Sequence, residues 1–303
     1  MTPAFSTVDD VITRLRAHRY VCDRRIATAL YLADRMQKPI LVEGPAGVGK
    51  TELAKVLALS LSTDLIRLQC YEGLDEAKAL YEWEYPKQLL YTQILRDKIG
   101  EVMHGTSTLA EAVDRLASQE DAFFSERFLL ARPLLAAIRA PKRVVLLVDE
   151  VDRADAEFEA FLLEVLSDFQ VSVPELGTIK AKFVPLVLLT SNNAREMTDA
   201  LKRRCLHLHI GYPDAARELE IVQSKVPEAA ESLTRDVVRI VQSIRGLDLK
   251  KRPSVSETLD WARALTILNA ESLTEPLVQE TLNLILKYEG DIDRAKEKLR
   301  EII

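Results

Sequence analysis

The chain has 303 residues, 48% hydrophobic, 29% charged and 6% aromatic, which is typical of a soluble globular protein with one large core and a smaller second domain. A disordered or fibrous chain is excluded. Its 47 acidic and 41 basic side chains give a net charge of −6, so the basic excess of a nucleic-acid-binding protein is missing and no nucleic acid partner is expected.

The cysteines and the N-terminus indicate a compartment. Cys22, Cys70 and Cys205 are widely spaced and form no CxxC pair, so neither a disulfide framework nor a zinc site is expected. The first twenty residues include acidic side chains and no apolar signal core, and no stretch reaches about 18 consecutive apolar residues. We therefore expect a cytoplasmic protein without membrane insertion.

The first predicted elements are two amphipathic helices, over Val8–Ala17 and Asp23–Met36, with Asp23 as the N-cap of the second. A short apolar run at Ile40–Val42 then meets a glycine loop, and an apolar-periodic segment follows over Thr51–Leu61. This order predicts a strand, a loop and a helix.

Four more apolar runs predict strands, at Asp64–Gln69, Arg143–Glu150, Val184–Asn192 and Cys205–Ile210. Helical patterns separate these runs, and two of them are nearly continuous Val, Leu and Ile, which favours parallel strands covered on both faces. We predict an α/β fold with a five-stranded, doubly wound core over residues 39–211. Residues 1–38 form an N-terminal helical segment, and the helical patterns of residues 212–303 predict an all-helical second domain.

Two stretches interrupt a minimal α/β core. Cys70–Gln93 holds Trp83 and four tyrosines, which serve either packing or partner contact. Phe169–Val184 alternates around Pro174 and Gly177 and predicts a hairpin, an element that often contacts partners.

A phosphate-binding loop with the pattern GxxxxGK[ST] lies between the first core strand and its helix. Its residues are Gly44, Pro45, Ala46, Gly47, Val48, Gly49, Lys50 and Thr51. The glycines let backbone N–H groups turn toward phosphates, and the helix N-terminus favours an anion. Lys50 would bridge the β- and γ-phosphates, and the Thr51 hydroxyl would bind Mg²⁺. ATP and Mg²⁺ are the expected ligands.

Two carboxylates, Asp149 and Glu150, follow a buried strand about a hundred residues later. Ligands bind at this end of the strands in open α/β sheets. Asp149 suits the magnesium shell, and Glu150 is placed to orient or deprotonate the attacking water. Together with the phosphate loop, this pair predicts nucleotide hydrolysis.

Further polar groups follow the next strand. Asn192 is expected to contact the γ-phosphate or the attacking water, although a turn cap also explains an asparagine there. Lys202, Arg203 and Arg204 end a predicted helix, where cations complement the helix dipole. The functional alternative is an arginine finger that reaches the nucleotide of a neighbouring subunit. Arg204 is the first candidate for this finger and Arg203 the second.

This combination resembles the AAA+ ATPases, and within them the MoxR group. The likeness is strongest over Asp149–Gly177, where Arg153 resembles an arginine that follows the acidic pair in MoxR proteins. Leu68–Leu90 and Lys251–Leu265 resemble the CoxD-type subgroup, which is associated with partners that carry a von Willebrand factor A domain and with metalloenzyme maturation.

The resemblance implies a P-loop core, a helical lid, a usually hexameric homo-oligomeric ring and ATP-driven remodelling of a protein client. It places Val21 near the start of the adenine pocket and makes Cys70–Gln93 an insert that engages partners or the ring pore. Ser256 stands where many MoxR proteins carry a lid arginine, and Arg252, one turn earlier, is the alternative source of that charge.

Two functions from different classes remain open. The first is an ATPase ring that activates a metalloenzyme complex, through a von Willebrand factor A domain adaptor. The second is a nucleotide-dependent scaffold that docks a partner and hydrolyses ATP only slowly.

Overall fold

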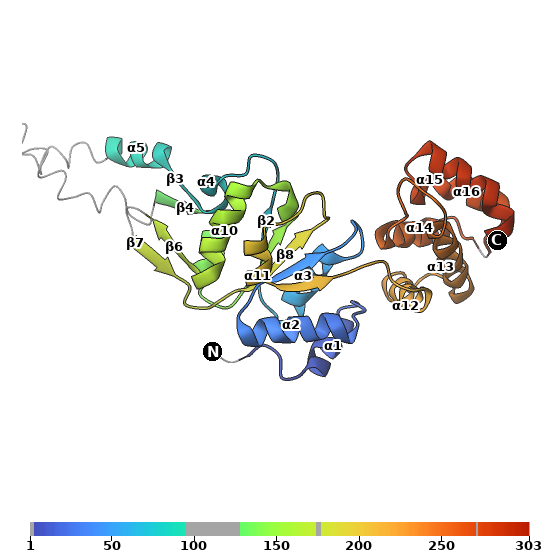
Figure 1. The fold of residues 1–303 in the computed structure, drawn as a ribbon, viewed down its shortest axis with the longest axis horizontal. Coiled ribbons are helices and arrows are strands. Elements are labelled where there is room, and N and C mark those ends of the chain that lie inside the picture. Colours follow the sequence, from blue (N-terminus) through green and yellow to red (C-terminus); the bar gives the residue numbers. More distant parts are fainter. Residues whose placement is uncertain (1–2, 95–127, 174–176, 271, 303) are drawn as a thin grey trace, which may run out of the picture.

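The computed structural model describes residues 3–94, 128–173, 177–270 and 272–302. At its centre is a parallel five-stranded sheet in the order β2-β5-β8-β1-β9, which confirms the predicted fold class (Figure 1). The strands are β1 (Ile40–Glu43), β2 (Leu65–Gln69), β5 (Val145–Asp149), β8 (Leu186–Ser191) and β9 (Leu206–His209). Each strand coincides with one of the apolar runs from which it was predicted.

The central strands are buried because helices cover both faces of the sheet. Every residue of β5 and of β8 is buried, as expected for strands whose two faces both meet helices. The register pairs Gln69 with Asp149, and Glu43 with Ser191, so the polar ends of neighbouring strands meet at one edge of the sheet. This edge carries the candidate site.

The helices of the core are α1 (Val8–Ala17), α2 (Arg24–Met36), α3 (Lys50–Ser60), α9 (Pro133–Ile138), α10 (Ala156–Asp168) and α11 (Asp199–Arg204), with a 3₁₀ turn η2 (Val151–Arg153). Asp23 caps α2 as predicted, since its carboxylate accepts the Ile26 N–H at 2.8 Å. Residues of α1 and α2 share one hydrophobic cluster with α3, β1 and β8. The N-terminal segment is therefore packed into the core.

One end of the core carries two small antiparallel sheets (Figure 1). The hairpin of β6 (Gln170–Val173) and β7 (Gly177–Lys180) confirms the hairpin prediction, except for residues 174–176, which lie outside the described residues. The other sheet joins β3 (Tyr81–Trp83) to β4 (Leu129–Ala131), and helices α4 (Glu76–Ala79) and α5 (Tyr85–Ile94) flank β3. This second sheet was not predicted.

The aromatic side chains of this insert differ in burial. Trp83 is buried and meets Tyr81 edge to face, with ring centroids 6.2 Å apart. Tyr71, Tyr85 and Tyr91 are exposed. Packing therefore explains the tryptophan, and the exposed tyrosines leave an aromatic surface beside the core.

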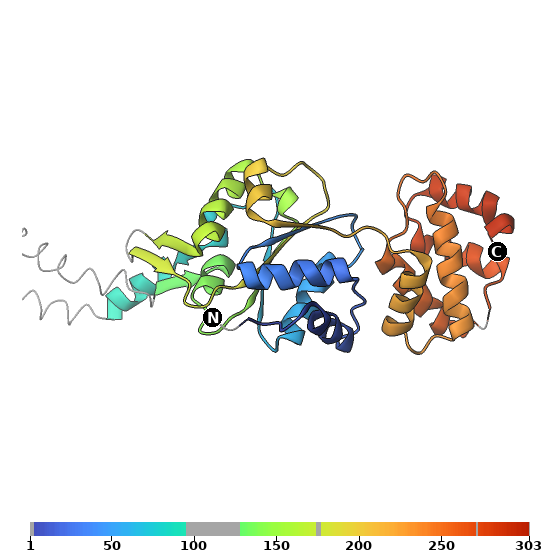
Figure 2. The same ribbon diagram turned by 60° about the horizontal axis from the view of Figure 1, so that its bottom comes forward.

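Five C-terminal helices form a separate body, here called the lid: α12 (Ala215–Lys225), α13 (Glu231–Arg245), α14 (Val255–Ile267), α15 (Glu275–Ile285) and α16 (Glu289–Ile302). Figure 2 shows it at the opposite end of the molecule from the two small sheets. The lid has its own hydrophobic cluster around Trp261. A buried ion pair between Arg245 and Glu218, 2.5 Å long, joins α13 to α12, and Arg245 also donates to the carbonyl of Pro253 just before α14.

Two findings bear on the expected compartment. None of the helices in the described part of the chain is long and apolar enough to cross a membrane. The three cysteines form no disulfide, and burial raises the pKa of Cys22 to about 11 and that of Cys70 and Cys205 to about 12.

Candidate active site

The phosphate loop connects β1 to α3, as predicted, and its backbone needs glycine at three positions. Gly44, Gly47 and Gly49 have φ values of +148°, +75° and +96°, which side chains disfavour. A Cβ on Gly44 would lie 1.9 Å from the Ile210 carbonyl oxygen, and one on Gly47 would lie 2.3 Å from Ser254 Oγ. The loop is a close-fitting backbone cradle at the start of α3, a suitable place for an anion.

Lys50 lies inside this cradle. Its ammonium donates to the carbonyls of Gly44 at 2.6 Å and Pro45 at 2.7 Å, and to Asn192 Oδ1 at 2.8 Å. Burial lowers the pKa of Lys50 to about 8, although the negative charges of Asp152 and Asp149 oppose that shift. A bound phosphate would supply the nearby negative charge that this lysine needs.

Asp149 is buried at the end of β5 and accepts several hydrogen bonds. Thr51 Oγ1 donates to it at 3.0 Å and Thr190 Oγ1 at 2.6 Å. Arg67, on β2, donates to Oδ2 from Nη2 at 2.6 Å and from Nε at 3.0 Å. The carboxylate is therefore fully engaged in this structure.

Glu150 follows Asp149 with a positive φ of 55°, which turns its side chain toward the strand ends. Its carboxylate accepts from Asn192 Nδ2 and Gln69 Nε2, both at 3.1 Å, and from Arg153 Nε at 2.8 Å. Its own backbone N–H donates to Thr190 Oγ1 at 2.9 Å. The structure thus brings Glu150, Asn192 and, through Asn192, Lys50 into one network.

The loop that carries Asn192 is held by a buried carboxylate. Asp152 Oδ2 accepts the backbone N–H groups of Asn192 at 3.0 Å and Ala194 at 2.8 Å. Asp152 belongs to η2, directly after Glu150 and Val151, so one short segment carries Glu150 and also positions the asparagine beside it.

The residues expected to bind Mg²⁺ fit that ion. Thr51 and Asp149 place a hydroxyl and a carboxylate within one hydrogen bond of each other, and Mg²⁺ prefers such oxygen ligands. In the described residues no cluster of three or more His, Cys, Asp or Glu could hold a metal on its own.

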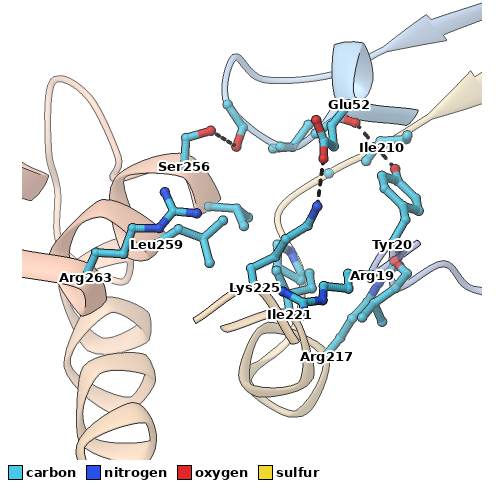
Figure 3. Close-up of a pocket in the computed structure, with 17 residues that line it drawn as sticks. Arg19, Tyr20, Glu52, Ile210, Arg217, Ile221, Lys225, Ser256, Leu259 and Arg263 are labelled. Atoms are coloured by element: carbon cyan, nitrogen blue, oxygen red, sulfur yellow. Dashed lines mark hydrogen bonds and ion pairs between the residues drawn. The ribbon is translucent and has the colours of Figure 1, made fainter. Parts of the chain in front are cut away.

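Two cavities adjoin the loop. One of about 280 Å³ is lined by Lys50, Thr51, Asp149, Glu150 and Asn192. The other, of about 250 Å³, lies between core and lid and is the pocket of Figure 3. Gly47, Gly49, Glu52 and Ser256 line both, so the two cavities are neighbours along the loop.

The second cavity has a mixed lining that suits a nucleoside. Apolar contacts come from Val21, Val48, Ile210, Ile221 and Leu259. Val21, which the family resemblance places near the start of an adenine pocket, lines this cavity. Tyr20 Oη donates to the Gly49 carbonyl at 3.5 Å, and Lys225 of the lid pairs with Glu52 at 2.7 Å across the cavity (Figure 3).

The lid touches the phosphate loop through the first turn of α14. The backbone N–H of Ser256 donates to the Gly47 carbonyl at 3.1 Å and its hydroxyl donates at 3.2 Å. Arg252 is exposed and lines neither cavity, whereas Arg263, two turns beyond Ser256 on the same helix, lines the second cavity. Of these three residues, Ser256 contacts the loop, Arg263 lines the second cavity, and Arg252 does neither.

The two candidate finger arginines lie at the end of α11, away from both cavities. Arg204 donates to the Leu163 carbonyl at 3.0 Å, and Arg203 is exposed. Neither lines the nucleotide cavities of its own chain. A role at a nucleotide would require a second subunit.

Sequence reasoning missed several residues of this site. Thr190 was passed over inside the run Val187–Asn193, and Arg67 and Gln69 were treated only as parts of a strand. Alternation on β2 was the available signal, because Arg67 and Gln69 must share one face of a strand next to β5. The contact of Ser256 with the loop had no local signal, since 209 residues separate the partners.

A protein-family comparison gives a match over the first part of the chain. The family model that matches is described as an AAA ATPase domain, and it matches residues 23–176, half of the chain. The match includes the phosphate loop and the acidic pair.

Several curated proteins are similar in sequence. The chaperone protein ClpB of Bacillus cereus is 25% identical over 202 residues, which are 66% of this chain and 18% of ClpB. The ATP-binding subunit ClpC of the Clp protease of Staphylococcus epidermidis is 22% identical over 98% of this chain and 29% of its own length. An uncharacterised protein of Staphylococcus haemolyticus is 24% identical over 88% of this chain and 90% of its own length. The chain thus spans less than a third of the Clp proteins that it matches.

Similar solved structures include the RuvB Holliday junction branch migration motor of Thermotoga maritima. Its TM-score is 0.47 at 15% identity, over 93% of this chain and 72% of that one. A mutant of the same protein reaches 0.49 at 16% identity, over 86% of this chain and 67% of its own.

Proposed function

Because the chain belongs to the AAA ATPase domain family and is an ATP-hydrolysing enzyme, we propose that it works in a homo-oligomeric ring that couples ATP hydrolysis to the remodelling of a bound protein. The observation that carries this proposal is the joint network of Lys50, Asn192 and Glu150 at the strand ends. It unites a phosphate ligand, a polar sensor and a general base.

Each residue has a role in this proposal. Lys50 exchanges its bonds to the loop carbonyls for the β- and γ-phosphates, and the backbone N–H groups of residues 44–51 bind the same phosphates. Glu150 accepts a proton from, or orients, the attacking water, while Asn192 holds that water or the γ-phosphate. Thr51 and Asp149 would hold Mg²⁺, whose charge would offset that of the phosphates.

A ring supplies what one chain lacks. Transition-state charge on the γ-phosphate is commonly stabilised by an arginine from a neighbouring subunit. The position of Arg204 and Arg203 outside their own cavities supports a role in trans, with Arg204 as the first candidate. A hexamer is the proposed assembly.

The finer proposal is a MoxR-type ATPase of the CoxD-like subgroup, based on the segments Leu68–Leu90, Asp149–Gly177 and Lys251–Leu265. Its client would be a metalloenzyme complex in the cytoplasm, reached through an adaptor with a von Willebrand factor A domain. The exposed Tyr71, Tyr85 and Tyr91 support the insert as the contact surface.

ATPase rate against protein concentration tests the ring, with assembly mass recorded by light scattering in the same buffers. The proteins are wild type, Glu150→Gln and Arg204→Ala, with Arg203→Ala as the matched neighbour. We expect the wild-type rate per subunit to rise with assembly. The ATPase rate of Glu150→Gln and of Arg204→Ala should be at least about 100-fold lower than that of wild type, while both variants still bind ATP. A rate independent of concentration and of both arginines would contradict the ring.

A slow nucleotide-dependent scaffold is the second candidate. It is favoured by the three side chains that already hold Glu150, because a base engaged by Arg153 and Gln69 is not free for water. Measuring client activation by Glu150→Gln with bound ATP distinguishes the two candidate functions. A scaffold variant should still activate the client, whereas a motor variant should not.

A further inference from the structure

Arg67 has no role in the proposed mechanism, although it contacts one of its residues. It projects from β2, one of the two edge strands of the sheet, and both of its hydrogen bonds to Asp149 end on one oxygen, Oδ2. Two N–H groups of one guanidinium thus bind a carboxylate that the mechanism reserves for Mg²⁺. Such charge-assisted bonds are among the strongest that a side chain forms.

The burial of the two partners differs sharply. The Asp149 side chain is 3% exposed, and that of Arg67 is 48% exposed. An ionised carboxylate at such depth needs a cationic partner or several donors. Arg67 supplies the cation now, and its exposed side chain has room to leave.

The other carboxylate oxygen of Asp149 also accepts hydrogen bonds. Oδ1 accepts from Thr51 at 3.0 Å and from Thr190 at 2.6 Å, and Thr51 also reaches Oδ2 at 3.3 Å, a longer contact than those of Arg67. A divalent cation that draws on Asp149, directly or through one of its waters, must therefore compete with Arg67 for Oδ2. Two cations on the same carboxylate also repel each other.

We propose that Arg67 is a resident cation, which neutralises Asp149 in the metal-free protein, is displaced when Mg²⁺ arrives and so sets the Mg²⁺ concentration that the site requires. This inference rests on the proposed function for the assignment of Thr51 and Asp149 to the metal. Lysine does not fully replace arginine here, because an ammonium lacks the fixed pair of N–H groups.

Arg67→Met tests the inference, since methionine keeps much of the length of the side chain and removes the charge. Arg14→Met is the matched control, because the Arg14 side chain is 41% exposed and pairs with Asp10 at 2.8 Å, outside both nucleotide cavities. Arg67→Lys is the conservative variant. For each protein, a fluorescent ADP analogue is bound while Mg²⁺ is titrated, and thermal unfolding is recorded in excess chelator and in excess Mg²⁺.

We expect Arg67→Met to lower the half-saturating Mg²⁺ concentration about fivefold to tenfold, with a smaller shift in the same direction for Arg67→Lys and none for Arg14→Met. In excess chelator, Arg67→Met should unfold at a lower temperature than wild type. In excess Mg²⁺, the difference between the two unfolding temperatures should be smaller. An unchanged or higher Mg²⁺ requirement in Arg67→Met would overturn the inference. If Arg67→Met does not fold, the direction of the Arg67→Lys shift decides.

The same titration separates this inference from the proposed function. If wild type binds the ADP analogue without any dependence on Mg²⁺, the proposed metal site is wrong. If wild type shows that dependence and Arg67→Met matches it, only the role of Arg67 is wrong.

Discussion

At the phosphate end of the site the contacts of Lys50 are charged and internal, whereas the contact of α14 with the phosphate loop is neutral and depends on backbone. Lys50 bonds to Asn192 and to loop carbonyls at one end. At the other end, Ser256 bonds to the Gly47 carbonyl. The charged contacts must be exchanged when a nucleotide binds, whereas the lid contact needs only that two surfaces fit closely. Charge therefore governs affinity at the phosphate end, and a close fit governs the contact between α14 and the loop, next to the ion pair of Lys225 with Glu52.

Removing the charge at the phosphate end should have the largest effect. Lys50→Ala deletes three donated hydrogen bonds and the cation that faces the phosphates, so we expect nucleotide affinity to fall at least about 100-fold. Titration of a fluorescent ADP analogue measures it, with Lys38→Ala as an exposed lysine control. An affinity loss below about fivefold would show that backbone N–H groups carry the phosphate without the lysine.

Disturbing the fit at the lid end should have the next largest effect. A methyl group in Gly47→Ala would meet Ser254 at 2.3 Å, so the lid must move away, and we expect about a tenfold loss of nucleotide affinity. Gly73→Ala is the matched control, because Gly73 has nearly the same φ, +77°, and no atom lies within 4 Å of the place that its methyl group would take. The control should lose about 1–2 kcal/mol of unfolding free energy through backbone strain and no affinity. Equal affinity losses in both proteins would contradict the role of shape.

Removing one hydrogen bond at the lid end should matter little. Ser256→Ala deletes the hydroxyl contact at 3.2 Å and keeps the backbone N–H contact at 3.1 Å to the same carbonyl. We expect a twofold to threefold loss of nucleotide affinity, which corresponds to about 0.5 kcal/mol. A loss near 100-fold would mean that the serine hydroxyl contacts the nucleotide itself.

The charge difference between the two ends also predicts a proton uptake. The pKa of Lys50 is about 8 before binding, below its ordinary 10.5, and a bound phosphate raises it. At pH 8 about half of this lysine is neutral, so nucleotide binding should take up roughly half a proton, and at pH 6.5 almost none. Calorimetry in buffers of different ionisation enthalpy measures the uptake. Lys50→Arg, which stays charged, should abolish it.

The lowered pKa of Lys50 also predicts how the stability of the nucleotide-free protein changes with pH. Between about pH 8 and 10.5 the unfolded chain binds more protons at Lys50 than the folded chain does. The contribution of Lys50 to the free energy of unfolding therefore rises with pH across that window. Denaturant unfolding of wild type and Lys50→Met over this range checks the direction.

The sequence allowed the fold and the phosphate end to be predicted because both depend on local patterns. The apolar runs marked all five strands of the parallel sheet, and spacing placed the phosphate loop with Lys50 after β1 and Asp149 at the end of β5. The sheet of β3 and β4 escaped prediction because Trp83 and Leu129, its partner in the register, are 46 positions apart in the sequence. The contact between Ser256 and Gly47 and the bonds of Arg67 to Asp149 depend on how distant segments pack, which no periodicity records.

The hydrophobic cluster of the lid, described above, shares no buried side chain with the two clusters of the sheet in the described part of the chain. Each body is then a cooperative unit of its own, and heating the free protein should give two calorimetric transitions. A ligand held by both bodies adds its binding energy only while both are folded. Nucleotide should therefore draw the two transitions together, so that the ligand itself makes the chain unfold as one.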